Sequence, residues 1–227
     1  MAMMGDNQEH YASGGLMSRE SRMPTDLGDA HKRIGNELHY LYTKWSWFKR
    51  LFCTDDESVR LLMDCSEPFA LVSRELMRDD IILGVCRITD RAQSCGRQNL
   101  TLDHLAGLIP SQEQALSAEL QQLIEEVHSS CAVFRKHRNR RVSHADMKAA
   151  LQLTNSLLPA IDIAQADEAL KAIADVLNAI EDHYDSGEHE YECGILNWKE
   201  AAEELLHFIA HEQYLQRYHD KRKFGSE

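Results

Sequence analysis

The chain has 227 residues, of which 43% are hydrophobic and 27% are charged, and its formal net charge is −12. This length suits one ordinary domain or two small ones, and 4 Pro with 11 Gly are too few for a collagen-like or disordered chain. The negative charge argues against a protein that coats nucleic acid by bulk attraction. Because the chain has neither a long apolar run nor an apolar signal segment near its start, we expect a cytoplasmic protein without a membrane partner.

In chain order, the pattern predicts a disordered tail, a series of helices and a basic C-terminal tail. The expected segments are a tail over residues 1–24, helices at about 25–52, 57–64, 68–88, 101–109, 111–141, 145–157, 163–184 and 197–219, and a tail over 220–227. Apolar residues recur at helical spacing in the first helix, at Ile34, Leu38, Leu41, Trp45, Phe48 and Phe52. The segment 68–88 is apolar almost all round, which predicts the buried centre of a bundle.

Helix starts are marked by capping residues, and loops separate the helices. We expect Thr101 and Asn197 to cap helices, and Ser111 with Gln114 to form a capping box. Residues 89–99 and 183–194 read as loops, and no stretch alternates long enough to predict a strand. The sequence therefore predicts an all-α helical bundle of about six to eight helices, with no significant sheet. We expect one domain over 25–219, with the last helix packed on it.

Six cysteines occur without any CxxC pair, at positions 53, 65, 86, 95, 131 and 193. Cys53, Cys65, Cys86 and Cys131 stand among apolar helical neighbours, where a free thiol behaves as a small hydrophobe. We therefore expect reduced thiols and neither a disulfide framework nor a zinc knuckle.

Basic residues are concentrated in one segment. Between positions 132 and 148 there are six basic residues and one acid, a charge of +5, which leaves −17 for the rest of the chain. Arg138 and His144 would point about 120° apart on one continuous helix. Ser143, with Asp146 three residues later, instead indicates that a new helix starts there, and such a start favours a phosphate and a neutral His144. A merely kinked helix, and a solvated helix end in place of a phosphate site, both stay open.

A second polar feature is the seam formed by Asp80, Gly84 and Arg87 in the apolar segment 68–88. Asp80 and Arg87 are about 10 Å apart along a helix axis, too far for an easy direct pair. Each is therefore expected to find a partner on another helix. Asp80 either holds Arg138 or pairs with a structural arginine, and Gly84 is expected to allow close helix packing.

The segment from Arg138 through Asn139 to His144 resembles the signature of the HEPN superfamily: an Arg followed by a polar residue, with a His several positions on. Over roughly residues 30–185, further stretches resemble the AbiU-like abortive-infection branch of that superfamily. These stretches are 39–42 with Trp45, 78–83, 87–90, 99–102, 135–140 and 144–146.

The resemblance implies a metal-independent endoribonuclease that needs no cofactor and acts as a homodimer with a composite active site. His144 would be the acid–base residue, Arg138 would stabilise the phosphorane, and Asn139 would support Arg138 or the phosphate. Neighbouring phosphates would be held by Arg135, Lys136, Arg140 and Arg141. By analogy, such a protein would be a toxin or antiphage effector, with an antitoxin or regulatory partner.

Other readings stay open from the residues alone. Two Glu-x-x-His pairs, Glu125 with His128 and Glu204 with His207, have the spacing of a di-iron bundle. However, Glu125 should face water, so we do not expect a metal. His207 and His211 would supply only two ligands from one helix. The main alternative to the nuclease is a non-catalytic dimeric module that binds RNA, a nucleotide or a partner protein at the same basic site.

Overall fold

The structure, a computed structural model, describes residues 23–94, 96–142, 161–184, 191 and 200–224. Its elements are α1 (Thr25–Phe52), α2 (Asp56–Thr89), β1 (Gln93–Ser94), β2 (Arg97–Gln98), α3 (Leu102–Gly107), α4 (Gln114–Ser130), α5 (Ala132–His137), the π-helix η1 (Arg138–Val142), α7 (Ile163–Tyr184) and α8 (Ala201–Phe224). Within these residues there are seven α-helices and a single hairpin. The prediction of an all-α bundle is therefore confirmed.

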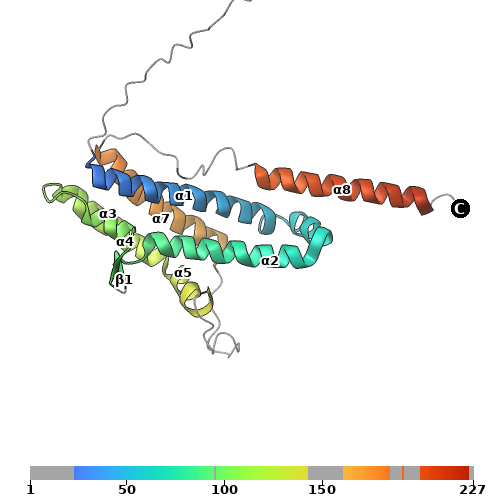
Figure 1. The fold of residues 1–227 in the computed structure, drawn as a ribbon, viewed down its shortest axis with the longest axis horizontal. Coiled ribbons are helices and arrows are strands. Elements are labelled where there is room, and N and C mark those ends of the chain that lie inside the picture. Colours follow the sequence, from blue (N-terminus) through green and yellow to red (C-terminus); the bar gives the residue numbers. More distant parts are fainter. Residues whose placement is uncertain (1–22, 95, 143–160, 185–190, 192–199, 225–227) are drawn as a thin grey trace, which may run out of the picture.

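The bundle is built around two long antiparallel helices, α1 and α2, which lie side by side (Figure 1). Helix α7 packs against α1 and, more extensively, against α4. The apolar stripes predicted for the first helix and for 163–184 face this core, and the largest fully buried side chains include Leu38, Leu170, Ile173 and Leu177. No described helix is long and apolar enough to cross a membrane.

Helix α2 contains a break that the sequence pattern predicted. Ser66 has non-helical backbone angles (φ −163°, ψ 96°), and Pro68 follows two residues later. Proline lacks the N–H of a helix interior but is well suited to a helix start, so the chain begins a new helical run there. Asp55 caps the first run by accepting a hydrogen bond of 2.6 Å from the Ser58 N–H.

The expectation that 68–88 is buried all round was wrong for its first half. Phe69, Val72 and Leu76 are exposed by 67%, 56% and 65%, whereas Ile81, Val85 and other residues of the second half are buried. The core surrounds only the second half of this segment. There, a Cβ on Gly84 would lie 2.7 Å from Leu41 Cδ1, so Gly84 allows the close packing of α1 and α2 that we expected.

The predicted continuous helix 111–141 is divided in the structure. It begins at Gln114 after Glu113, without a side-chain cap, so the predicted capping box at Ser111 was wrong. It breaks at Cys131 (φ −86°, ψ 2°). Near the break, the Val127 carbonyl accepts a hydrogen bond of 3.3 Å from Ser130 Oγ, and a side-chain bond of this kind competes with the helical ladder.

The predicted loop 89–99 contains the hairpin of β1 and β2, which is too short to show an alternating pattern. Gly96, in its turn, has φ +75°, the left-handed region that glycine adopts readily. The hairpin leads to α3, whose predicted cap is confirmed, because Thr101 Oγ1 accepts from the His104 N–H at 3.3 Å.

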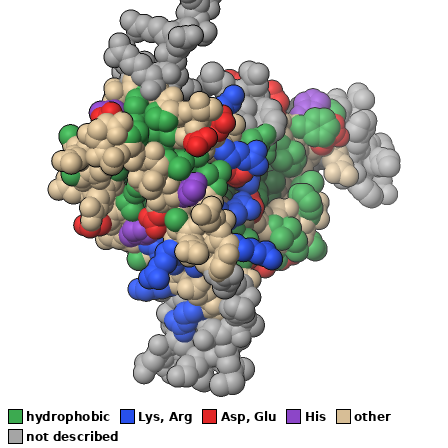
Figure 2. Space-filling model, turned by 60° about the vertical axis from the view of Figure 1, so that its left-hand side comes forward, with side chains coloured by type: hydrophobic (Ala, Val, Ile, Leu, Met, Phe, Trp, Pro, Cys, Tyr) green, Lys and Arg blue, Asp and Glu red, His purple; other side chains and the backbone are tan. Residues whose placement is uncertain are grey.

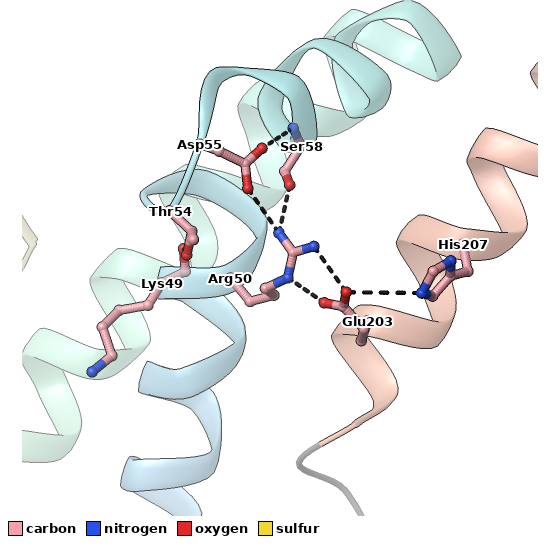
Figure 3. A network of polar contacts seen from close by, with 7 residues as sticks. All are labelled: Lys49, Arg50, Thr54, Asp55, Ser58, Glu203 and His207. Carbon is pink, nitrogen blue, oxygen red and sulfur yellow. Dashed lines mark hydrogen bonds and ion pairs between the residues drawn. The ribbon is translucent and has the colours of Figure 1, made fainter.

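Helix α8 packs on α1 and α2. Figure 3 shows Arg50, at the end of α1, between Asp55 and Glu203. Its Nη2 donates to Glu203 Oε1 at 3.0 Å, its Nε donates to Oε2, and its Nη1 donates to Ser58 Oγ at 2.6 Å. This helix continues to Phe224, so the predicted basic tail 220–227 is mostly helical, as the Lys and Arg in it allow. The predicted Asn197 cap and the helix 145–157 lie outside the described residues.

Candidate functional site

The end of α2 forms one wall of a hollow of about 590 Å³. The other walls come from the hairpin, α3, the end of α4, and α5 with η1. The lining residues are Thr89, Asp90, Arg91, Gln93, Ser94, Asp103, His128, Arg135 and Arg138. Figure 2 shows Lys and Arg side chains spread from the upper right to the lower end of one face, with acidic side chains among them. We refer to this hollow as the arginine pocket.

Arg138, the first residue of η1, is held from two sides. Its Nη1 donates to Asp90 Oδ2 and its Nε donates to Asn139 Oδ1 at 3.0 Å. The Arg138 side chain is only 22% exposed. This contact agrees with one of the two roles that the sequence left open for Asn139, support of Arg138, and the role itself stays a prediction. A π-helical turn of this kind is rare and occurs frequently at functional sites.

Asp80 does not hold Arg138. Its Oδ2 accepts from Lys44 Nζ at 2.5 Å, its Oδ1 lies 4.0 Å from Arg87 Nη2, and its side chain is 45% exposed. The expected partner of Asp80 on another helix is therefore confirmed as Lys44 of α1. The expectation of a buried seam was wrong for its two charged residues, which are partly exposed and approach each other, whereas Gly84 is buried. The side chains of Asp80 and Arg87 lean along the helix toward each other. Their charged ends therefore lie closer together than the rise between the two residues along the helix axis. The carboxylate that holds Arg138 is Asp90, at the end of α2.

Two of the four predicted phosphate-binding residues, Arg135 and Arg141, are tied by hydrogen bonds to other elements of the bundle. Arg135 Nη1 donates to Thr89 Oγ1 at 3.1 Å, and its Nη2 donates to the backbone carbonyl of His128. Arg141 Nη2 donates to Asp79 Oδ1 and ties η1 back to α2. Lys136 is exposed and Arg140 is half-buried. Arg135 thus builds the pocket wall, whatever else it binds.

Two buried thiols lie behind the arginines. Burial raises the pKa of Cys86 to about 12 and that of Cys131 to about 11, although nearby arginines act in the opposite direction. Both thiols are therefore protonated at neutral pH, and neither is an activated nucleophile. Cys53 is half-buried, whereas Cys65 is exposed, contrary to the expectation that all four cysteines lie among apolar neighbours.

His144, with Ser143 and Asp146 of the predicted helix start, lies outside the described residues. The choice between a new helix and a kink therefore stays a prediction. The π-helix reaches Val142, immediately before this junction.

The pocket also contains a pair that the sequence analysis did not recognise as part of the site. His128 Nε2 lies 3.2 Å from Asp103 Oδ1. A signal was present in the sequence: His128, Arg135 and Arg138 are separated by seven and three residues, the spacing of one helix face. The sequence alone places His128 in a metal motif with Glu125, which is exposed as expected.

Among the described residues, no group of three His, Cys, Asp or Glu side chains has the geometry to hold a metal ion. His207 lies 3.8 Å from Glu203, and both His207 and His211 are exposed. Glu204, the other member of its Glu-x-x-His pair, also faces solvent.

An all-α helical bundle is the class of fold that the HEPN resemblance predicts. A comparison with family models supports this class directly. The HEPN_AbiU2 family, described as AbiU2, matches residues 24–205, which is most of the chain. The chain therefore belongs to this family of HEPN proteins. No curated protein and no solved structure matches it significantly.

Proposed function

We propose that this protein is a metal-independent endoribonuclease that cleaves RNA by attack of a ribose 2′-OH. The observation that carries the proposal is the position of Arg138, held at the arginine pocket by Asp90 and Asn139. A guanidinium fixed in this way can stabilise the extra negative charge of a phosphorane without reorganising. Lysine cannot present the same paired donors.

The reaction needs proton transfer at two oxygens. His144 removes the proton from the 2′-OH while the 2′-oxygen forms a bond to phosphorus. The bond from phosphorus to the 5′-oxygen breaks, and that oxygen takes a proton from His144 of the partner subunit. The products are a 2′,3′-cyclic phosphate and a 5′-hydroxyl. Acid–base catalysis of this kind contributes about 10² to 10⁴ in rate.

The reaction as written needs two copies of His144, so we propose that the active form is a homodimer. Lys136 and Arg140 would hold neighbouring phosphates without reading sequence. The requirement for a 2′-OH selects RNA over DNA. Membership of the AbiU2 family supports a role as a toxin or abortive-infection effector that acts in the cytoplasm and is restrained by an antitoxin or another partner.

The test uses purified wild type and His144→Ala, both confirmed folded by circular dichroism, with labelled single-stranded RNA and tRNA in EDTA. We expect cleavage by the wild type alone, leaving 2′,3′-cyclic phosphate ends. The cleavage rate of Arg138→Lys should fall about 10²-fold, because lysine keeps the positive charge but lacks the paired N–H donors of the guanidinium. Equal cleavage by wild type and His144→Ala would contradict the proposal.

One observation favours a non-catalytic RNA-binding module instead. Asp90 and Asn139 already occupy Nη1 and Nε of Arg138, which leaves fewer of its donors for the phosphorane of a cleavage reaction. If neither protein cuts RNA and both retain it, with binding lost in Arg138→Ala but kept in His144→Ala, the binding module becomes the better account.

A further inference from the structure

The arginine pocket contains a histidine–carboxylate pair that the proposed reaction does not use. His128, near the end of α4, and Asp103, in α3, are joined through Nε2 and Oδ1 at 3.2 Å. Their side chains are 37% and 27% exposed. Both line the same hollow as Arg135 and Arg138, so a ligand in the pocket can reach them.

We propose that His128 binds a phosphate of the RNA in this pocket and that Asp103 is its positioning partner. The inference rests on the proposed function, because it takes RNA as the ligand. A carboxylate on one ring nitrogen fixes the orientation of an imidazole. With Nε2 directed at Asp103, Nδ1 is the nitrogen left for the phosphate oxygen, and it donates when the ring carries a proton on both nitrogens.

The formal charge of the pocket lining is positive, which suits a phosphate ligand. The lining contains three arginines and two aspartates, a charge of +1 with His128 counted as neutral. Asp90 offsets the charge of Arg138 directly. A phosphate diester brings one negative charge, which a positive lining attracts. The volume of about 590 Å³ lies in the range of ligand sites and accommodates a nucleotide.

The end of α4 is also held by a bond that does not use the His128 side chain. The backbone carbonyl of His128 already accepts a hydrogen bond from Arg135 Nη2, and Arg135 is anchored to Thr89. The same arginine thus fixes the backbone of His128 and lines the pocket. A purely structural role would make the His128–Asp103 pair a tie between α3 and α4, and that reading predicts loss of stability without loss of binding.

The test measures binding to a labelled 2′-O-methyl RNA, which has no 2′-OH to attack and so separates binding from cleavage. We expect His128→Ala to weaken binding about tenfold, as for a lost charged hydrogen bond, and Asp103→Asn to weaken it about threefold. His183→Ala is the matched control, because His183 lies 3.0 Å from Glu113, with side-chain exposures of 33% and 32%, and does not line the pocket. It should bind as the wild type does.

Each outcome decides one of the two proposals. If wild type and His128→Ala bind equally, the role of His128 is overturned whether or not the melting temperature falls, and the nuclease proposal stands on its own cleavage test. If His128→Ala binds RNA more weakly but is also less stable, His128→Gln decides, because glutamine retains a donor for Asp103. Weakened RNA binding by His128→Gln supports the inference, and binding equal to that of the wild type overturns it. If no form of the protein binds this RNA, the role of His128 is overturned, and the nuclease proposal is decided by its cleavage test.

Discussion

At the scale of single residues, the chemistry of the site depends on which carboxylate meets which arginine. Arg138 is held by Asp90, and Arg141 by Asp79, while Asp80 pairs with Lys44. These ion pairs are partly exposed, so each contributes little to stability. Their value is in orientation, because a fixed guanidinium contributes more to a transition state than a mobile one.

We therefore predict that Asp90→Asn lowers the rate of RNA cleavage about tenfold without weakening RNA binding. The variant loses the charge-assisted bond that positions Arg138 and at the same time removes a negative charge from the pocket. The measurement is single-turnover cleavage beside a binding isotherm.

Asp80→Asn is the matched control for Asp90→Asn, because this carboxylate lies on α2 and contacts Lys44 rather than Arg138. Its cleavage rate should stay within about twofold of the wild-type rate. A tenfold loss in Asp80→Asn, with none in Asp90→Asn, would reverse our assignment of the two residues.

At the scale of elements, α8 depends on an exposed ion pair as well as on buried Ala202 and Leu206. The hydrogen bonds from Arg50 hold the pKa of Glu203 below its usual value, and the Ser58 N–H together with Arg50 lowers the pKa of Asp55. A depressed carboxyl pKa contributes stability above the unfolded value and loses it as the pH falls through the folded value.

We accordingly predict that α8 loosens from α1 and α2 as the pH falls below about 4.5, the ordinary value for Glu203. Backbone amide chemical shifts of α8, followed by NMR against pH, would report this. Glu203→Gln should show shifts of the loosened form already at neutral pH, whereas the exposed neighbour Glu204→Gln should titrate like the wild type. Identical titrations of all three would rule out this role for the Arg50–Glu203 pair.

The bounds of helices that turn an apolar face to the core could be predicted from the sequence. Helix breaks that depend on hydrogen bonds between distant segments could not. The bounds of α1 and α7 follow from unbroken apolar stripes, and the break near Pro68 follows from its missing N–H. The break at Cys131 lies where Ser130 and Arg135 donate to the carbonyls of Val127 and His128. The anchor of Arg135, Thr89, is remote in the sequence, so no local pattern shows this bond.

The same limit applied to the site. The basic character of 135–141 is visible in the sequence, and the HEPN resemblance identified the family correctly. Asp90 and Asp80 are both acids near the end of one helix, and only their neighbours in space separate a residue that holds Arg138 from one that does not. Similarly, the pairing of Asp103 with His128 depends on how α3 packs against α4.

At the scale of the whole molecule, an acidic protein is proposed to bind a polyanion. The net charge is −12, yet the segment 132–148 carries +5. Two fields therefore act on an approaching RNA: general repulsion by the acidic body and local attraction by the basic segment. Salt screens both, but contact pairs that release counterions dominate the salt dependence once the RNA is bound.

We predict that RNA binding weakens as salt rises, with a slope set by the few phosphates contacted rather than by the net charge. Each phosphate contact on a single strand contributes about 0.7 to the slope of log K against log salt. Lys136→Ala removes an exposed cation of the segment and should lower the slope by about that amount. Lys171→Ala is the control: it removes a cation of α7 that is paired with Asp175, and it should leave the slope unchanged. Titrations at several salt concentrations between about 50 and 200 mM give the slope. Binding that strengthens with salt would mean that repulsion by the acidic body controls the encounter, and the basic segment would then not be the RNA site.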